Sequence, residues 1–177
     1  MITRCGAALV AIGITASLAT AGQFIDLGVP VRQAGLRART TGPDADGKRT
    51  MVYLSFNQPA GLFLVQINPD TGESHQYNST VSSGASGLIA GPDGRVYLGT
   101  SEGAHFLRFD PAKPEEGLVD LGQATDSEEM IWLMTVGKDD GMVYACAYPH
   151  AKLFACDTAT GELKDLGSMS ETEKYAR

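Results

Sequence analysis

The sequence predicts an all-β protein built from a repeated unit of about 45 residues. The dipeptide Val-Tyr recurs in steps of 44 and 47 residues, at Val52-Tyr53, Val96-Tyr97 and Val143-Tyr144. A turn led by Asn or Asp follows each dipeptide, at 68–73, 110–113 and 157–162. Short strands separated by Gly, Pro and Asp turns at a period of about 40–50 residues are typical of β-propeller blades. We therefore expect about three four-stranded antiparallel blades that form an open, incomplete β-propeller.

The first 21 residues have the pattern of a signal peptide. Arg4 is followed by an uncharged stretch of small and apolar residues that ends in Ala19-Thr20-Ala21, a small-x-small cleavage site. A retained membrane anchor is the alternative, but the stretch is shorter than the ~20 mostly apolar residues that span a bilayer. We expect cleavage before Gly22 and a secreted or periplasmic product that is not bound to a membrane.

The chain that would remain, residues 22–177, is acidic. It has 13 basic residues against 21 acidic ones, a net charge of −8. A negative chain is poorly suited to bind phosphate backbones or anionic membrane surfaces. The sequence also lacks a run of Lys and Arg and a Gly-rich phosphate loop. We expect no nucleic-acid partner, no membrane partner and no cofactor.

Spacing along the chain divides the mature region into repeats. The predicted order is a closing strand at 24–28, blades at about 36–77, 86–121 and 130–166, and the start of another blade at 175–177. Asp-Leu-Gly ends the second and third units, and a new first strand is expected ten residues after each of these Asp residues. Propellers usually close with about 4–8 blades. The chain therefore resembles a fragment, whose open ends would leave apolar faces uncovered and favour self-association.

The second unit shows how one blade is read. Its strands are expected at 86–90, 95–100 and 104–109, with a fourth strand around 118–121. The turn Gly91-Pro92-Asp93-Gly94 suits a tight reversal, because Pro fixes φ and Gly tolerates positive φ. A sandwich of similar short strands is the competing fold, but sandwich strands need not recur in groups of four. A helical solenoid is excluded by the lack of long amphipathic stripes.

Three segments carry a resemblance to a known group of proteins. They are Gly-Pro-Asp-Gly-Arg-Val-Tyr at 91–97, Leu-Phe-x-x-Asp at 153–157 and Asp-Thr-Ala-Thr-Gly-Glu-Leu at 157–163. Together with Asp-Leu-Gly they resemble secreted bacterial β-propeller repeat proteins of the NHL, YVTN and quinoprotein-like types. That group includes extracytoplasmic binding scaffolds, polysaccharide lyases and lactonases. The matching residues are turn and packing residues, so no catalytic residue is carried over.

Ligands of propellers usually bind where the loops between second and third strands meet the loops that link blades. A carbohydrate site there would use aromatic rings to stack on sugars, and carboxylates or amides to bind hydroxyls. The residues of these types in the expected loops are Tyr148, His150, Gln58, Glu102 and Glu128. The alternative is that all of them are ordinary polar loop residues.

Metal binding is not expected. The three histidines, His75, His105 and His150, lie in different units and have no metal-ligand spacing. Acidic residues also cluster at 126–129 and 138–140, where paired carboxylates could act as acid and base or bind Ca²⁺. The spacing of an EF-hand loop is missing, which favours a solvated acidic linker.

Cys146 and Cys156 are candidates for a disulfide. They are equidistant from Ala151, where the hairpin is expected to turn, so they would lie opposite each other. Export to an oxidising compartment would permit the bond, if the Cβ geometry suits it. Two buried free thiols are the alternative.

Two functions remain open at this point. The first is an extracytoplasmic binding or scaffold module whose partner is a carbohydrate or another protein. The second is part of a carbohydrate-active enzyme, a polysaccharide lyase or hydrolase, whose site needs further blades.

Overall fold

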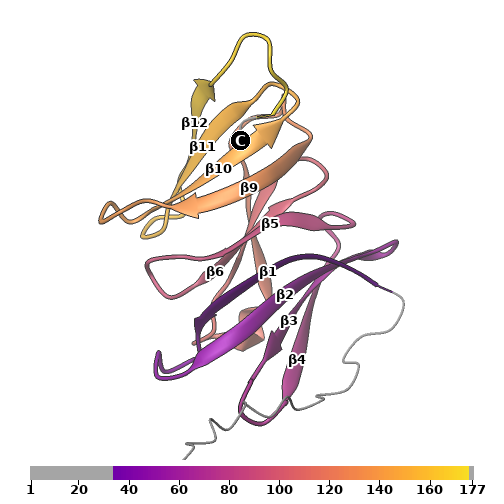
Figure 1. Ribbon diagram of the computed structural model, residues 1–177, viewed down its shortest axis with the longest axis vertical. Coiled ribbons are helices and arrows are strands. Elements are labelled where there is room, and N and C mark those ends of the chain that lie inside the picture. Colours follow the sequence, from indigo (N-terminus) through magenta and orange to yellow (C-terminus); the bar gives the residue numbers. More distant parts are fainter. Residues whose placement is uncertain (1–33, 176–177) are drawn as a thin grey trace, which may run out of the picture.

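A computed structural model describes residues 34–175, which form three four-stranded antiparallel sheets (Figure 1). Sheet 1 contains β1 (Gly35–Pro43), β2 (Thr50–Gln58), β3 (Gly61–Ile67) and β4 (Ser74–Ser79). Sheet 2 contains β5 (Ala85–Ala90), β6 (Val96–Thr100), β7 (His105–Phe109) and β8 (Leu118–Gln123). Sheet 3 contains β9 (Met130–Val136), β10 (Met142–Tyr148), β11 (Lys152–Asp157) and β12 (Leu163–Ser168). A short 3-10 helix, η1 (Pro114–Glu116), precedes β8.

These sheets confirm the all-β class and the three antiparallel groups of four strands. Within each sheet, the strands that are consecutive in sequence are neighbours in space. The expected signal peptide at 1–21, the expected closing strand at 24–28 and residues 176–177 lie outside the described part of the chain.

Sheets 2 and 3 repeat the same backbone irregularities, so the repeat seen in the sequence is also a repeat of conformation. Ala104 and Ala151, which align in the repeat, both have φ of 48°. Positive φ is uncommon for residues other than Gly, so two aligned cases indicate one shared hairpin path. Gly122 and Gly167 likewise share a φ of 94°, each directly after an Asp-Leu pair.

The sheets pack most closely through their first strands. Strand β1 lies against β5, and β5 lies against β9, whereas β8 makes only weak contacts with β4 and β12. Figure 1 shows β9, β5 and β1 succeeding one another along the long axis of the molecule. The three sheets therefore converge at their first strands and diverge at their fourth strands.

Two hydrophobic cores hold the sheets together. Between sheets 1 and 2 lie Tyr53, Leu64, Val96, Leu98 and Phe109. Between sheets 2 and 3 lie Tyr97, Phe106, Ile131, Phe154 and Cys156. Successive residues of a strand point to opposite faces, so Val96 and Tyr97 fill different cores although both are fully buried. Burial of each such large side chain contributes about 1.5–3 kcal/mol, so sheet 2 is stabilised from both faces.

The predicted disulfide is wrong. Cys146 pairs with Leu153 across the β10–β11 hairpin, whereas Cys156 pairs with Val143. Residues 143 and 146 are three apart on β10 and therefore point to opposite faces of sheet 3. The β10–β11 hairpin reverses before Ala151 and not at it, so the two strands do not have the register that would place Cys146 opposite Cys156. Both thiols are accordingly free, with Cys156 buried in the core.

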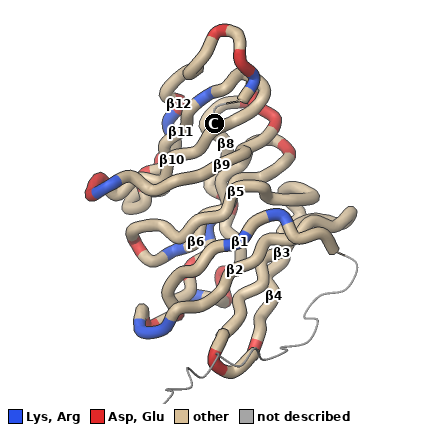
Figure 2. Tube along the Cα trace, in the orientation of Figure 1, with Lys and Arg blue, Asp and Glu red and all other residues tan. Residues whose placement is uncertain are grey.

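Charged residues lie mainly at turns and sheet ends, as the tube in Figure 2 shows. Strands β5, β6, β9 and β10, which build the centre of the stack, contain no charged residue. The charged residues that do lie within strands are on β1, β7, β8, β11 and β12. Between residues 34 and 175, no helix has the length and apolar character needed to cross a membrane.

Candidate functional site

The residues predicted as a binding site lie at one end of the strands. This end, which we call the hairpin edge, consists of the β2–β3, β6–β7 and β10–β11 hairpins together with the linkers 80–84 and 124–129. The first linker is bound to two hairpins: Gln58 N donates to Ser83 O at 3.1 Å, and Ser101 N donates to Gly84 O at 2.9 Å. Each linker therefore bridges neighbouring sheets at this edge.

Glu102 fastens the β6–β7 hairpin to the first linker. Its carboxylate accepts hydrogen bonds from Ser83 Oγ at 2.6 Å and from Ser83 N at 3.1 Å. The hydroxyl bond and then the backbone bond hold the pKa of Glu102 below its usual range, so the group is ionised at neutral pH. Because Gln58 also bonds to Ser83, the structure brings Gln58 and Glu102 together through this serine.

Glu128 has the corresponding role at the second linker. Here the carboxylate belongs to the linker and binds the hairpin, whereas Glu102 belongs to the hairpin and binds the linker. The Glu128 carboxylate lies 2.7 Å from His150 Nδ1 and accepts a hydrogen bond from His150 N at 3.1 Å. The residue is only 3% exposed, so these contacts compensate for burial of a carboxylate. The His150 side chain is 59% exposed, so most of its ring faces solvent.

Tyr148 belongs to the same cluster. Its carbonyl oxygen accepts a hydrogen bond from Glu129 N at 2.8 Å, which anchors the second linker on the hairpin. Its ring stacks on Tyr175 with centroids 4.7 Å apart, and Tyr175 meets the edge of Trp132 at 5.7 Å. Sequence reasoning identified Tyr148 but not Trp132 and Tyr175, which come from other parts of sheet 3 and the segment after it.

The five predicted residues thus form two clusters that border different hollows. One hollow, of about 380 Å³, is lined by Asn57, Gln58 and Ser83. The other, of about 390 Å³, is lined by His150 and by residues 170–174. In the first hollow, the buried Oδ1 of Asn57 has no hydrogen-bond partner in the described part of the chain.

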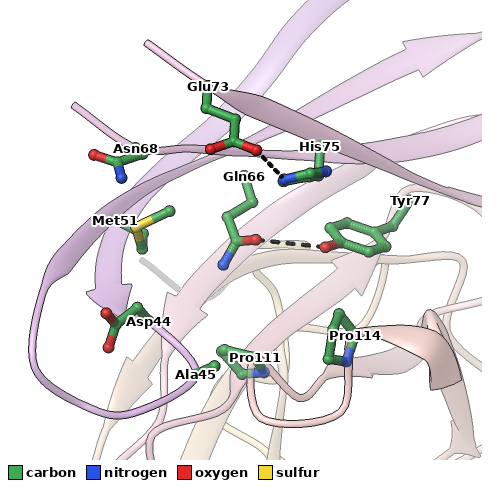
Figure 3. Close-up of a pocket in the computed structure, with 10 residues that line it drawn as sticks. All are labelled: Asp44, Ala45, Met51, Gln66, Asn68, Glu73, His75, Tyr77, Pro111 and Pro114. Carbon is green, nitrogen blue, oxygen red and sulfur yellow. Dashed lines mark hydrogen bonds and ion pairs between the residues drawn. The ribbon is translucent and has the colours of Figure 1, made fainter. Parts of the chain in front are cut away.

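A third pocket, which the sequence did not indicate, opens at the other end of the strands (Figure 3). Its volume is about 390 Å³. The β1–β2 turn, the start of β2, the end of β3, the β3–β4 turn, the first half of β4 and the β7–β8 loop surround it. It therefore lies between sheets 1 and 2. We call it the inter-sheet pocket.

A chain of hydrogen bonds forms the polar wall of the inter-sheet pocket. Tyr77 OH donates to Gln66 Oε1 at 3.4 Å, and Gln66 Nε2 donates to Tyr53 OH at 2.9 Å. Tyr53 OH in turn donates to Pro43 O at 2.6 Å. Burial raises the pKa of Tyr53 to about 12 and also raises the pKa of Tyr77, so both phenols stay protonated. Figure 3 shows Gln66 and Tyr77 meeting across the pocket.

The inter-sheet pocket is negatively charged. Asp44 and Glu73 contribute carboxylates, and Glu73 Oε1 lies 3.3 Å from His75 Nε2 at the solvent-exposed margin. Although desolvation opposes it, hydrogen bonds from the backbone of Lys48 and Arg49 hold the pKa of Asp44 below its usual range. Of the described residues that line the pocket, none is Lys or Arg.

The histidines remain apart from one another in the structure. His75 on β4 pairs with Glu73, and His105 on β7 lies 3.0 Å from Asp120 through Nδ1. His150 is held by Glu128 at the hairpin edge. Across residues 34–175, no group of three or more His, Cys, Asp or Glu side chains is arranged to hold a metal ion.

Comparison with known proteins finds no family model and no curated protein that match this chain.

Proposed function

We propose that the three sheets are consecutive blades of a β-propeller, and that the chain is an extracytoplasmic binding or scaffold module. Propeller blades are four-stranded sheets arranged around a central channel. Convergence of β1, β5 and β9, with divergence of the outer strands, supports this arrangement.

The segment after β12 supports the same proposal. Ala151 N donates to Lys174 O at 3.1 Å, which repeats the bond from Ala104 N to Glu129 O at 3.2 Å. Lys174 thus takes the position that Glu129 has in the second linker. Tyr175 then corresponds to Met130, the first residue of β9. On this correspondence, we assign Tyr175 to the start of another blade.

The hairpin edge is the proposed binding surface. The main support is that its two carboxylates, Glu102 and Glu128, are already used to hold loops in place. Both oxygens of Glu102 and both oxygens of Glu128 are engaged in contacts that fix loops. Carboxylates used in this way suit a rigid recognition surface better than the paired acid and base of a hydrolase. The groups that a partner can contact are the exposed His150 ring and the nearby rings of Tyr148 and Trp132.

A carbohydrate or a protein is the proposed partner. Aromatic rings with one open face can stack on a sugar ring, and they are also favoured at protein interfaces. Tyr148 and Trp132 supply such rings near the exposed His150.

Affinity electrophoresis of the exported chain through gels that contain neutral or acidic polysaccharides tests the carbohydrate case. We expect at least one polysaccharide to retard the chain, and Tyr148→Ala or His150→Ala to remove the retardation. Lys113→Ala, in the β7–β8 loop at the other end of the strands, is the matched control and should behave as the unchanged chain. Cleavage of a retarding polysaccharide would favour the enzyme instead. Retardation that survives both substitutions would move the site away from this edge.

A further inference from the structure

The inter-sheet pocket has a filled counterpart in the next repeat. In sheet 2, Arg95 precedes Val96 and extends toward sheet 3. Arg95 Nε donates to Asp110 Oδ2 at 3.0 Å, and one terminal nitrogen donates to Asp93 Oδ2 at 3.1 Å. The same nitrogen reaches Thr158 O of sheet 3 at 3.3 Å. The Arg95 guanidinium therefore fills the junction between sheets 2 and 3, at the end of the strands opposite the hairpin edge.

Sheet 1 has Met51 at the position of Arg95, since Met51 precedes Val52 as Arg95 precedes Val96. It also has Gln66 where sheet 2 has Arg108: Gln66 pairs with Tyr53, and Arg108 pairs with Tyr97. Both replacements exchange an arginine for a shorter, uncharged side chain. The junction between sheets 1 and 2 is consequently left with a pocket of about 390 Å³.

The groups that surround the arginine in sheet 2 also have counterparts in the pocket wall. Asp44 follows Gly-Pro as Asp93 does, and Asn68 begins the same turn as Asp110. Pro111 of sheet 2 stands where Thr158 stands in sheet 3. Asp44, Asn68 and Pro111 all line the inter-sheet pocket. The pocket therefore corresponds to the space that Arg95 fills between sheets 2 and 3, but sheet 1 supplies no arginine to fill it.

We propose that the inter-sheet pocket binds an alkylguanidinium group, the side chain of a free or peptide-linked arginine. The carboxylates of Asp44 and Glu73 supply charge that no Lys or Arg among the described lining residues offsets. Met51 and Pro111 give apolar contact for the methylene stem. The ring of Tyr77 can stack on the planar cation, as guanidinium groups favour. This site is separate from the hairpin edge and does not depend on what binds there.

Amide NMR of the full chain, titrated with N-acetyl-arginine methylamide, tests the proposal. We expect saturable shifts at Gln66, His75 and Tyr77, and at least about tenfold weaker binding of the citrulline analogue, which has the same shape without the charge. Free arginine, tested separately, distinguishes an amino-acid ligand from a peptide one. The tighter of the two identifies the source.

A double substitution, Met51→Arg with Asn68→Asp, should rebuild the Arg95–Asp110 pair inside the pocket and reduce binding at least about tenfold. Met142→Arg is the matched control, because Met142 precedes Val143 in sheet 3 and lies outside the pocket. If the double variant unfolds, Glu73→Gln keeps the test decisive. Its side chain is 67% exposed, so it should weaken binding without changing the melting temperature.

Three results would overturn the proposal. The first is a lack of saturable shifts at the pocket residues with either arginine ligand. The second is equal affinity for the citrulline analogue. The third is unchanged binding by a folded Met51→Arg/Asn68→Asp chain, or by Glu73→Gln if that double variant does not fold.

Discussion

Glu128→Ala removes a carboxylate that is 3% exposed and that holds linker 124–129 on the β10–β11 hairpin. Glu102→Ala removes a carboxylate with equally good hydrogen-bond geometry, to Ser83, at the preceding junction. Glu102 is exposed, whereas Glu128 is buried. The two substitutions therefore separate the contribution of burial from that of hydrogen-bond geometry.

The expected magnitude follows from the contacts. Loss of Glu128 leaves the amide of His150 without its partner, which costs about 1–3 kcal/mol in a buried setting. The contact with the imidazole adds less than about 1 kcal/mol, because that ring is 59% exposed and screened by water. We expect Glu128→Ala to lower the free energy of unfolding by about 2–3 kcal/mol. Water can replace the contacts of Glu102, so its loss should cost below about 1 kcal/mol.

Calorimetry or circular dichroism measures the difference. About 2–3 kcal/mol corresponds to a fall of about 4–12 °C in the melting temperature of a domain of this size. Urea unfolding with an unchanged slope would show that the effect lies in stability. Equal losses for the two variants, or a loss of less than about 0.5 kcal/mol for Glu128→Ala, would refute the assignment of Glu128 as a buried clamp.

Further predictions concern the packing between sheets, acid stability and the thiols. Gly99→Ala should destabilise the fold by about 1–3 kcal/mol in thermal unfolding, because the added methyl would overlap Ile131 of sheet 3; an unchanged melt would contradict the packing of these sheets. Although desolvation opposes it, hydrogen bonds from a backbone N–H and a guanidinium hold the pKa of Asp110 below its ordinary 3.8. Its contribution is therefore present above pH 3.8 and lost as the pH falls below that value, and Asp110→Asn should flatten this part of the stability profile. Cys146 and Cys156 should both titrate as free thiols in the denatured, unreduced chain. In the native chain Cys146 should react first, because burial raises the pKa of Cys156 to about 11.

The strands could be predicted from the sequence because alternation and turn chemistry act locally. In the second unit, predicted strands 86–90 and 104–109 correspond closely to β5 and β7. Pro and Gly at 91–94 set the turn by their own φ preferences. The sequence placed Gln58, Glu102, Glu128, Tyr148 and His150 in loops at one end of the strands, but it did not indicate that they would form two separate clusters.

Features that depend on packing between distant residues could not be predicted. The register of β10 against β11 is set by the turn that precedes Ala151. Ala151 has a positive φ there, which is uncommon for alanine and could not be expected from the residue type. The disulfide failed for that reason. The inter-sheet pocket results from side-chain length, with Met51 and Gln66 in place of two arginines. Its existence becomes apparent only when the two junctions are compared in space.

Sedimentation velocity over a concentration series tests most directly the proposal that sheets of this type stack face on face as blades. Leu133 and Leu166 of sheet 3 are 47% and 51% exposed, whereas Leu121, the counterpart of Leu166, packs against the core between sheets 2 and 3. We expect the chain to self-associate through this uncovered face. Leu133→Glu with Leu166→Glu should abolish the association, whereas Ala112→Glu with Ala159→Glu, in exposed turns, should not. A monomer at every concentration, with a sharp cooperative melt, would contradict the proposal.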